Sequence, residues 1–319
     1  MDSAADRLLV RGVAVKRVAI IGAGVLGAST AHHLAGRAEV FLIDAGEVGD
    51  GTTGRSYSRL SAWGKQPDSY FRLNHEGMRA HAAFPGDWYH PCGTLLTGSA
   101  ADRAQAVRLG YAVESVDDDR VFLPEEGWVD APLYARSLAA LSGASVMTGC
   151  SVTGLRPGWE VVFDRGSLHA DVVVNTAGNG AARIAAMAGH SLTLVPSFGM
   201  LVELSAPAHP LRHIVHTDDV TLRPLSADRL LLRGPSADAA LSSGLVAASE
   251  LILLATKVVP WLESATIHDV RIGSRVIPRG GLPSVGAVPG VDGYLHAVAH
   301  SGVILAPVIG KHLAELALT

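Results

Sequence analysis

The chain has few cysteines and no strongly basic segment. Its two cysteines, Cys92 and Cys150, do not form a C-x-x-C pair. They are too few for a disulfide framework, and their spacing does not indicate thiol redox chemistry. The formal net charge is −4, and Lys and Arg do not gather into basic blocks. We therefore expect no nucleic-acid partner.

Long apolar runs are also missing. The most apolar helix candidate, residues 245–262, contains Glu250 and Lys257 and is closed by Pro260. This pattern predicts an amphipathic helix that faces the core, and no membrane span. Residues 1–15 carry charges around a short apolar patch and do not resemble a signal peptide. We expect a cytoplasmic protein, with a homo-oligomer as one alternative for its assembly.

The most informative segment that is present is a nucleotide-binding unit near the N-terminus. Residues 18–21 predict a buried parallel strand, and a helix is expected from about Val25 to Leu34. Between them, Gly22 permits a tight turn and Gly24 lets the backbone approach a pyrophosphate. Gly27 lets the helix pack closely, and the helix N-terminus directs its N–H groups at the phosphates. The pattern predicts a dinucleotide site.

Asp44 completes this unit at the end of a second predicted strand, residues 39–43. Its carboxylate can accept hydrogen bonds from ribose hydroxyls and would repel a 2′-phosphate. NADP is therefore disfavoured.

The rest of the chain alternates between helical and strand-rich patterns. Residues 85–132 predict short strands in a separate antiparallel layer, and residues 171–178 predict another buried parallel strand that ends in a glycine turn. Helices are expected over 70–84 and 133–141, and a second strand-rich block over 198–204, 213–216 and the hairpin 220–233.

Separate segments along nearly the whole chain resemble the FAD-dependent amino acid and amine oxidases, typified by D-amino acid oxidase and glycine oxidase. Besides the N-terminal unit, Gly51-Thr-Thr-Gly54-Arg55-Ser56 is similar to the second phosphate-side loop of that family, and Val174-Asn-Thr-Ala-Gly178 to a strand end that contacts FAD. The most specific segments, 275–286 and 293–307, resemble the arginine strand, turn and glycine-opened helix that close over the isoalloxazine.

The resemblance implies an α/β fold in which a Rossmann-type FAD-binding domain is intertwined with an antiparallel-sheet substrate domain. The implied FAD-binding domain comprises residues 14–84, 132–195 and 271–319, and the substrate domain comprises 85–131 and 196–270. Residues expected to contact FAD are Gly22, Gly24, Val25, Leu26, Gly27, Asp44, Thr52, Thr53, Arg55, Ser56, Val152, Ala177, Gly178, Gly281, Ser301, Gly302, Val303 and Ile304. We expect non-covalent FAD, because no Cys follows Cys150 and residues 51–60 contain no His.

The implied reaction is oxidation of the C–N bond of a small amino acid or amine, with hydride transfer to flavin N5 and an imine as product. Arg275 is the first candidate to hold a substrate carboxylate, because a guanidinium offers two parallel hydrogen bonds. Arg223 is a second candidate, although the sequence does not show which face of its strand is inward. His300 is expected to lie beside the flavin.

Several alternatives stay open at this stage. Trp63 is read equally well as a wall of the cavity or as core, and His296 and His300 share a predicted strand without suggesting a metal site. Gly280-Gly281 stands where the family usually has Asp-Gly, and the middle strand block is short. A flavin dehydrogenase with an acceptor other than oxygen and a non-catalytic flavoprotein subunit are therefore retained, whereas an NAD-dependent dehydrogenase leaves the C-terminal segment unexplained.

Overall fold

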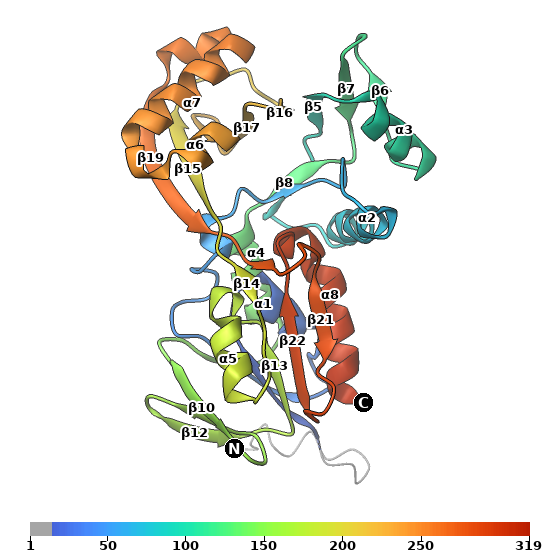
Figure 1. Ribbon diagram of the computed structural model, residues 1–319, viewed down its shortest axis with the longest axis vertical. Helices are drawn as coiled ribbons and strands as arrows, with labels where there is room; N and C mark the ends of the chain where they lie inside the picture. The colour runs from blue at the N-terminus through green and yellow to red at the C-terminus, as the bar shows by residue number, and fades with distance from the viewer. Residues whose placement is uncertain (1–14) are drawn as a thin grey trace, which may run out of the picture.

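The computed structural model describes residues 15–319, so residues 1–14 of the segment compared with a signal peptide lie outside the described part. Its lower half contains a six-stranded sheet in the order β21-β22-β13-β1-β2-β9 (Figure 1). The neighbouring strands pair in parallel except β21 with β22. The strands are β1 (Arg17–Ile21), β2 (Glu39–Ile43), β9 (Ser145–Met147), β13 (Val172–Asn175), β21 (Ser284–Ala287) and β22 (Tyr294–Val298).

Both faces of this sheet are covered, which is why its central strands are apolar throughout. One face packs against α1 (Val25–His33), α4 (Ala131–Leu141) and α8 (Gly302–Leu318). The other packs against α5 (Ala181–Met187) and a small sheet made of β10 (Val152–Arg156), β11 (Glu160–Phe163) and β12 (Gly166–His169). This doubly covered parallel sheet is the predicted nucleotide-binding architecture.

The upper half is built on an eight-stranded sheet in the order β19-β15-β18-β17-β16-β5-β7-β6. Its pairings are antiparallel except that of β16 with β5. The strands are β5 (Thr94–Thr97), β6 (Glu114–Ser115), β7 (Arg120–Leu123), β15 (Phe198–Ser205), β16 (Ile214–His216), β17 (Thr221–Pro224), β18 (Arg229–Arg233) and β19 (Thr266–Ser274). The short helix α6 (Pro235–Ala239) and α7 (Leu245–Val258) cover one part of it.

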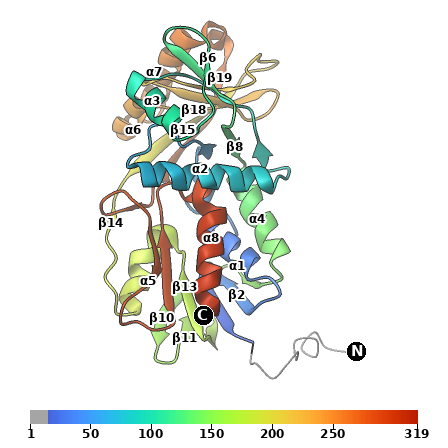
Figure 2. The ribbon, with the colours of Figure 1, turned by 90° about the vertical axis from the view of Figure 1, so that its right-hand side faces the viewer.

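Short elements join the halves. Helix α2 (Asp68–Ala83) lies across the molecule between them (Figure 2). A three-stranded sheet in the order β3-β8-β4 contains Arg59–Leu60, Gly127–Val129 and Tyr89–His90, and β14 (Leu194–Val195) pairs with β20 (Ile277–Pro278). No helix within residues 15–319 combines the length and apolarity needed to cross a bilayer.

The structure differs from the predicted elements in a few places. Residues 85–132, expected to contain only strands, include α3 (Ala100–Arg108), whose N-terminus is capped by the Ser99 side chain accepting from the backbone N–H of Asp102. The helix expected over 245–262 ends at Val258 and continues as a 3-10 turn, Pro260–Ser264. Proline explains this break, because it lacks the N–H that would continue the helix.

Candidate cofactor and substrate site

A cavity of about 520 Å³ extends from the carboxyl ends of the parallel strands to the eight-stranded sheet. Gly22 and Asp44 line one end of it, and Gly199, Arg233 and Arg275 belong to its upper part. Open parallel sheets bind ligands beyond the carboxyl ends of their strands. The cavity therefore lies where this fold is expected to hold a dinucleotide.

The glycine turn shapes the lower end. Gly22 has φ +108°, and a Cβ there would overlap the carbonyl group of Thr176, so only glycine fits. Gly22, Gly24, Val25 and Leu26 line the cavity at the start of α1. The positive end of this helix and its free N–H groups suit a pyrophosphate. Gly27 does not line the cavity, because it packs against the Gly22 carbonyl and permits the close helix contact.

Asp44 lies beside this turn at the end of β2. Its Oδ2 accepts a hydrogen bond from the Ala23 N–H at 2.6 Å, and its Oδ1 accepts one from the Gly46 N–H at 2.8 Å. A carboxylate has about four acceptor positions, so acceptors remain for hydroxyl groups. The backbone contacts hold the carboxylate at the position predicted for ribose binding.

The second phosphate-side loop closes over the same end. Thr53 Oγ1 accepts a hydrogen bond from the Val25 N–H at 3.2 Å, and Thr52 Oγ1 accepts one from Asn179 Nδ2 at 3.0 Å. These contacts tie the loop to α1 and to the turn after β13. Thr52, Thr53, Arg55, Ser56, Ala177 and Gly178 all line the cavity.

The start of α8 forms the opposite wall, where Ser301, Gly302, Val303 and Ile304 line the cavity. Ser301 Oγ lies 2.9 Å from Lys65 Nζ, which donates to it, and 2.8 Å from the hydroxyl of Tyr70. The pKa of Lys65 is lowered to about 8, first by burial and then by the charge of Arg59. A lysine ammonium and the positive end of a helix therefore meet on one wall.

His300 also lines the cavity, in the turn between β22 and α8. Its pKa is lowered to about 4, first by burial and then by the charges of Lys65, Arg275 and Arg233. His300 is therefore neutral at pH 7. Because β22 ends at Val298, the expectation that His296 and His300 share a strand face is wrong. The ring of His296 is buried, and its Nε2 lies 2.8 Å from Ser284 Oγ.

Arg275 follows β19 and lines the upper cavity. Its guanidinium lies against Gly199, where a Cβ would overlap it. It also forms an ion pair with Asp238, whose other oxygen accepts a hydrogen bond from the Met200 N–H at 2.8 Å. The guanidinium occupies the space that the missing Cβ of Gly199 leaves open, and the Asp238 carboxylate holds it there in one orientation.

Arg223, Val152 and Gly281 do not line the cavity. Arg223 is 3% exposed, and its Nε donates to the Tyr57 carbonyl at 3.0 Å while its Cζ lies 3.8 Å from the Trp128 ring centroid. Burial lowers its pKa to about 10. The Val152 carbonyl accepts a hydrogen bond from Arg183 Nη1 at 2.8 Å, and Gly281 lies in the turn after β20. Arg223, the second candidate for holding a substrate carboxylate, is therefore buried against Tyr57 and Trp128 and does not face the cavity.

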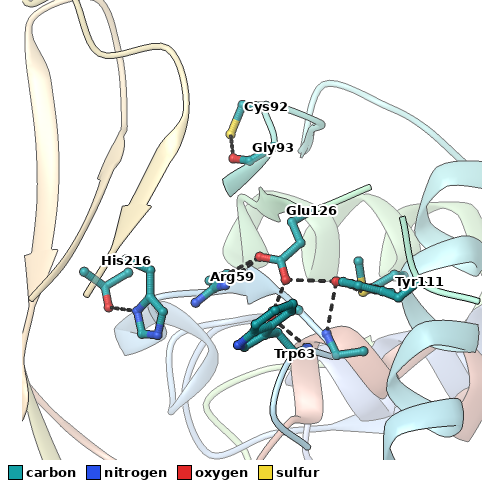
Figure 3. Close-up of polar contacts among 11 residues, drawn as sticks. Arg59, Trp63, Cys92, Gly93, Tyr111, Glu126 and His216 are labelled. Carbon is teal, nitrogen blue, oxygen red and sulfur yellow. Dashed lines mark hydrogen bonds and ion pairs between the residues drawn. The ribbon is translucent and has the colours of Figure 1, made fainter. Parts of the chain in front are cut away.

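Arg59 is a cavity residue that the sequence interpretation missed, and a buried network holds it (Figure 3). Its Nη2 lies 2.7 Å from Oε2 of Glu126, which is fully buried. The other oxygen, Oε1, accepts hydrogen bonds from Ser61 Oγ at 2.5 Å and the Tyr111 hydroxyl at 2.8 Å. Arg59 and Ser61 come from β3 and its end, Tyr111 and Glu126 come from two other segments, and Glu126 neutralises Arg59.

Other residues missed by the sequence analysis line the same space, namely Tyr57, Lys65, Asn179, Gly199 and Arg233. Arg59 and Lys65 lie three and nine residues after the second phosphate-side loop, so their closeness to it in the sequence was a usable signal. No local pattern marks Arg233. Trp63 both lines the cavity and packs against the core, which accommodates both of its predicted roles.

These features together fit an elongated dinucleotide with a redox-active ring. The glycine turn, the start of α1 and Asp44 can hold the adenosine and pyrophosphate portions. The start of α8 and Lys65 offer positive potential farther along the cavity. Within residues 15–319 no group of three or more His, Cys, Asp or Glu side chains is arranged to hold a metal ion.

Comparisons with known proteins agree with this geometry. A glycine oxidase of Geobacillus kaustophilus is 30% identical over 207 residues, covering 61% of this chain and 55% of that protein. A glycine oxidase of Bacillus licheniformis is 24% identical and covers 94% of this chain and 92% of its own length. The crystal structure of glycine oxidase from Geobacillus kaustophilus superimposes with a TM-score of 0.81 at 24% identity, over 95% of both chains.

The family comparison covers almost the whole chain. Residues 17–316 match the family model described as DAO, FAD dependent oxidoreductase. The match includes the glycine turn, the second loop and the start of α8. This protein therefore belongs to the family of FAD dependent oxidoreductases.

Proposed function

We propose that this protein oxidises the C–N bond of a small amino acid, with Arg275 holding the substrate carboxylate. The observation that carries the proposal is the position of this guanidinium. It lines the upper cavity against Gly199, whereas Asp44 lines the lower, dinucleotide end. A planar guanidinium held in one orientation can bind a carboxylate through two parallel hydrogen bonds.

FAD would be bound by the cavity-lining residues of the glycine turn, the second loop, the end of β13 and the start of α8. When bound, it supplies the acceptor for the hydride that leaves the substrate α-carbon. We propose that the attachment is non-covalent. Neither Cys92 nor Cys150 lines the cavity, which supports this proposal.

The chain's own side chains would mainly position the reactants. Lys65, held by Ser301, places an ammonium group beside the positive end of α8. His300 is neutral and can donate or accept a hydrogen bond without adding charge. Tyr57 and Trp63 also line the cavity and would supply it with aromatic walls.

The proposed division of labour follows the two large sheets. Residues 14–84, 132–195 and 271–319 would bind FAD, and residues 85–131 and 196–270 would form the substrate domain. The cavity-lining residues of β15 and β18, such as Gly199 and Arg233, support this division because they face the site from the eight-stranded sheet.

The test is an anaerobic screen of the FAD-loaded protein with pairs of an amino acid and its decarboxylated amine. Loss of the oxidised flavin absorption reports reduction of the cofactor. We expect amino acids to reduce the flavin faster than the matched amines, because only the acids carry the group that Arg275 would hold. Equal rates for acid and amine would contradict the carboxylate contact, and absence of reduction by any member would contradict the amino acid oxidation itself.

A further inference from the structure

The upper part of the cavity contains more positive than negative groups. Four cations line it, namely Arg59, Lys65, Arg233 and Arg275, and a fifth lining cation, Arg55, belongs to the second phosphate-side loop. Among the residues lining the cavity, Asp44 is the one acidic side chain, and it lies at the dinucleotide end. The net charge of the upper part of the cavity therefore depends on which of these cations has a carboxylate partner.

Three of the four cations have an evident role or partner. The buried Glu126 neutralises Arg59. Asp238 pairs with Arg275, and Lys65 donates to Ser301 where the start of α8 meets the proposed flavin position. Of these four cations, the other three each donate a side-chain hydrogen bond, and Arg233 is the one for which the described residues show none.

The guanidinium of Arg233 has unused hydrogen-bonding capacity. Its nearest acidic atom is Asp238 Oδ2, 3.8 Å from Nη2, which exceeds hydrogen-bond distance, and that oxygen already pairs with Arg275. Within residues 15–319, the structure records no hydrogen bond from the Arg233 side chain. A guanidinium carries five N–H donors, and here its one ion-pair partner, Asp238, is shared with Arg275.

Arg233 also lies next to the proposed carboxylate anchor. Both guanidiniums approach the same oxygen of Asp238. Their charges both lower the pKa of His300, after burial and Lys65. The side chain of Arg233 is 38% exposed and lines the cavity, so it is accessible to a molecule bound there.

We propose that Arg233 binds a second acid group of the substrate, so that the preferred substrate is an amino acid with two carboxylates. This inference rests on the proposed function, in which Arg275 holds the first carboxylate. A dicarboxylate whose amine is uncharged would balance the charges of Lys65, Arg233 and Arg275 once Asp238 is included. A monocarboxylate would leave one positive charge of this group unbalanced.

The experiment compares matched substrates that differ by one carboxylate. Alanine and aspartate, each as both enantiomers, and N-methylglycine with iminodiacetate are mixed anaerobically with the FAD-loaded wild type and the variants Arg233→Met and Arg233→Lys. The measured quantity is the second-order rate of flavin reduction. Arg271→Met is the matched control, because Arg271 lies in the same sheet, pairs with Glu203 at 2.8 Å and does not line the cavity.

We expect the wild type to favour the dicarboxylate of at least one pair by about tenfold or more, the ratio that corresponds to about 1.4 kcal/mol. Arg233→Met should reduce this preference at least about tenfold. Arg233→Lys should retain part of this preference, because lysine keeps the positive charge but lacks the planar pair of N–H donors of a guanidinium. Arg271→Met should keep the wild-type preference.

A second readout does not require turnover. Binding of unreactive succinate and butyrate is measured from the perturbation of the flavin absorption spectrum, with FAD content and melting temperature recorded for every protein. Succinate should bind the wild type more tightly than butyrate, and Arg233→Met should remove the difference. If Arg233→Met does not retain FAD, the test uses two other results. These are the preference of the wild type for the dicarboxylate and the reduction of that preference in Arg233→Lys.

The results separate this inference from the proposed function. A wild type that reacts as well with the monocarboxylates would overturn the inference while leaving amino acid oxidation intact. Equal loss for both members of a pair in Arg233→Met would also overturn it, because Arg233 would then hold a single carboxylate. If no amino acid reduces the flavin but succinate binding depends on Arg233, the anion site stands and the proposed reaction fails.

Discussion

Lys65 Nζ donates a hydrogen bond of 2.9 Å to Ser301 Oγ, across a separation of 236 residues in the chain. The contact joins the loop after β3 to the first turn of α8. It places an ammonium group beside the positive end of a helix, and both groups line the cavity. Positive potential at this position favours a bound group that gains negative charge on reduction.

Replacing Lys65 by Met should therefore lower the midpoint potential of the bound flavin. Loss of one nearby cation is expected to cost about 1.4 kcal/mol, which is about 30 mV for a two-electron couple. Because the pKa of Lys65 is about 8, the charged form predominates below that pH. The difference between wild type and variant should thus be largest below pH 8 and shrink above it. Potentiometric titration measures it, with the exposed Lys311 on α8 as a matched control in Lys311→Met. Equal potentials for wild type and Lys65→Met at pH 7 would contradict this role.

Replacing Arg275 should slow flavin reduction by amino acids in the order Ala more than Lys more than wild type. Lys keeps the charge without the planar fork, and Ala loses both. Loss of the contact is expected to cost about 2–5 kcal/mol of transition-state stabilisation. Anaerobic stopped-flow reduction by an amino acid and by its decarboxylated amine measures the effect, with FAD content as the control. If the rates of flavin reduction by the amino acid and by the amine fall equally, or if Arg275→Ala does not retain FAD, Arg275 has a structural role.

Asp44→Asn should weaken FAD binding. The carboxylate already accepts from the Ala23 and Gly46 N–H groups, and an amide would turn a donor toward one of them or toward the ribose. A lost charge-assisted hydrogen bond is worth about 1.5–3 kcal/mol. Fluorescence titration of the apoprotein with FAD measures the affinity. Asp50→Asn is the matched control, because Asp50 is exposed and does not line the cavity. An FAD affinity equal to that of wild type in Asp44→Asn would show that Asp44 does not contact the ribose.

Glu126→Ala should strongly destabilise the protein, because it leaves Arg59 without its buried partner (Figure 3). Breaking one side of a buried ion pair costs about 3–5 kcal/mol. Urea unfolding of the FAD-loaded protein measures the loss. The neighbouring Glu125 is exposed, so Glu125→Ala should cost far less. The double variant Arg59→Met/Glu126→Met should recover part of the stability. Similar losses for Glu125→Ala and Glu126→Ala would show that the network contributes little.

The bound flavin should be released by acid. Precipitation of the yellow protein with trichloroacetic acid is expected to leave the colour in the supernatant, because the proposed attachment is non-covalent. Absorption near the flavin maximum in both fractions gives the result. A yellow pellet would identify a covalent attachment, and His300 and Tyr57 would then be the cavity residues to map.

The dinucleotide end could be predicted from the sequence because its parts are close together in the chain. Gly22, Gly24 and Asp44 belong to one strand-turn-helix-strand unit, whose geometry follows from local turns and from the pairing of β1 with β2. The apolar strand before Gly178 and the glycine that opens α8 carry similar local signals. Helix α3 was missed although Ser99 and Asp102 have the spacing of an N-terminal cap, because the strand-like segments around them dominated the interpretation.

The substrate end was decided by tertiary structure. Thr221 pairs with Arg233 and Arg223 with Leu231, so both arginines lie on one face of the hairpin. Alternation along a strand determines the face but not the distance from the cavity, and the packing of Tyr57 and Trp128 around Arg223 leaves Arg233 at the open end. The contacts of Glu126 with Arg59 and of Lys65 with Ser301 likewise join segments that are distant in the sequence, so tertiary structure determines them too. Short-range backbone geometry suffices for the glycine turn and Asp44, so the amino-acid sequence alone could indicate them. Which cations line the upper part of the cavity depends on strand register and on contacts between distant segments, and these appear only in the folded chain.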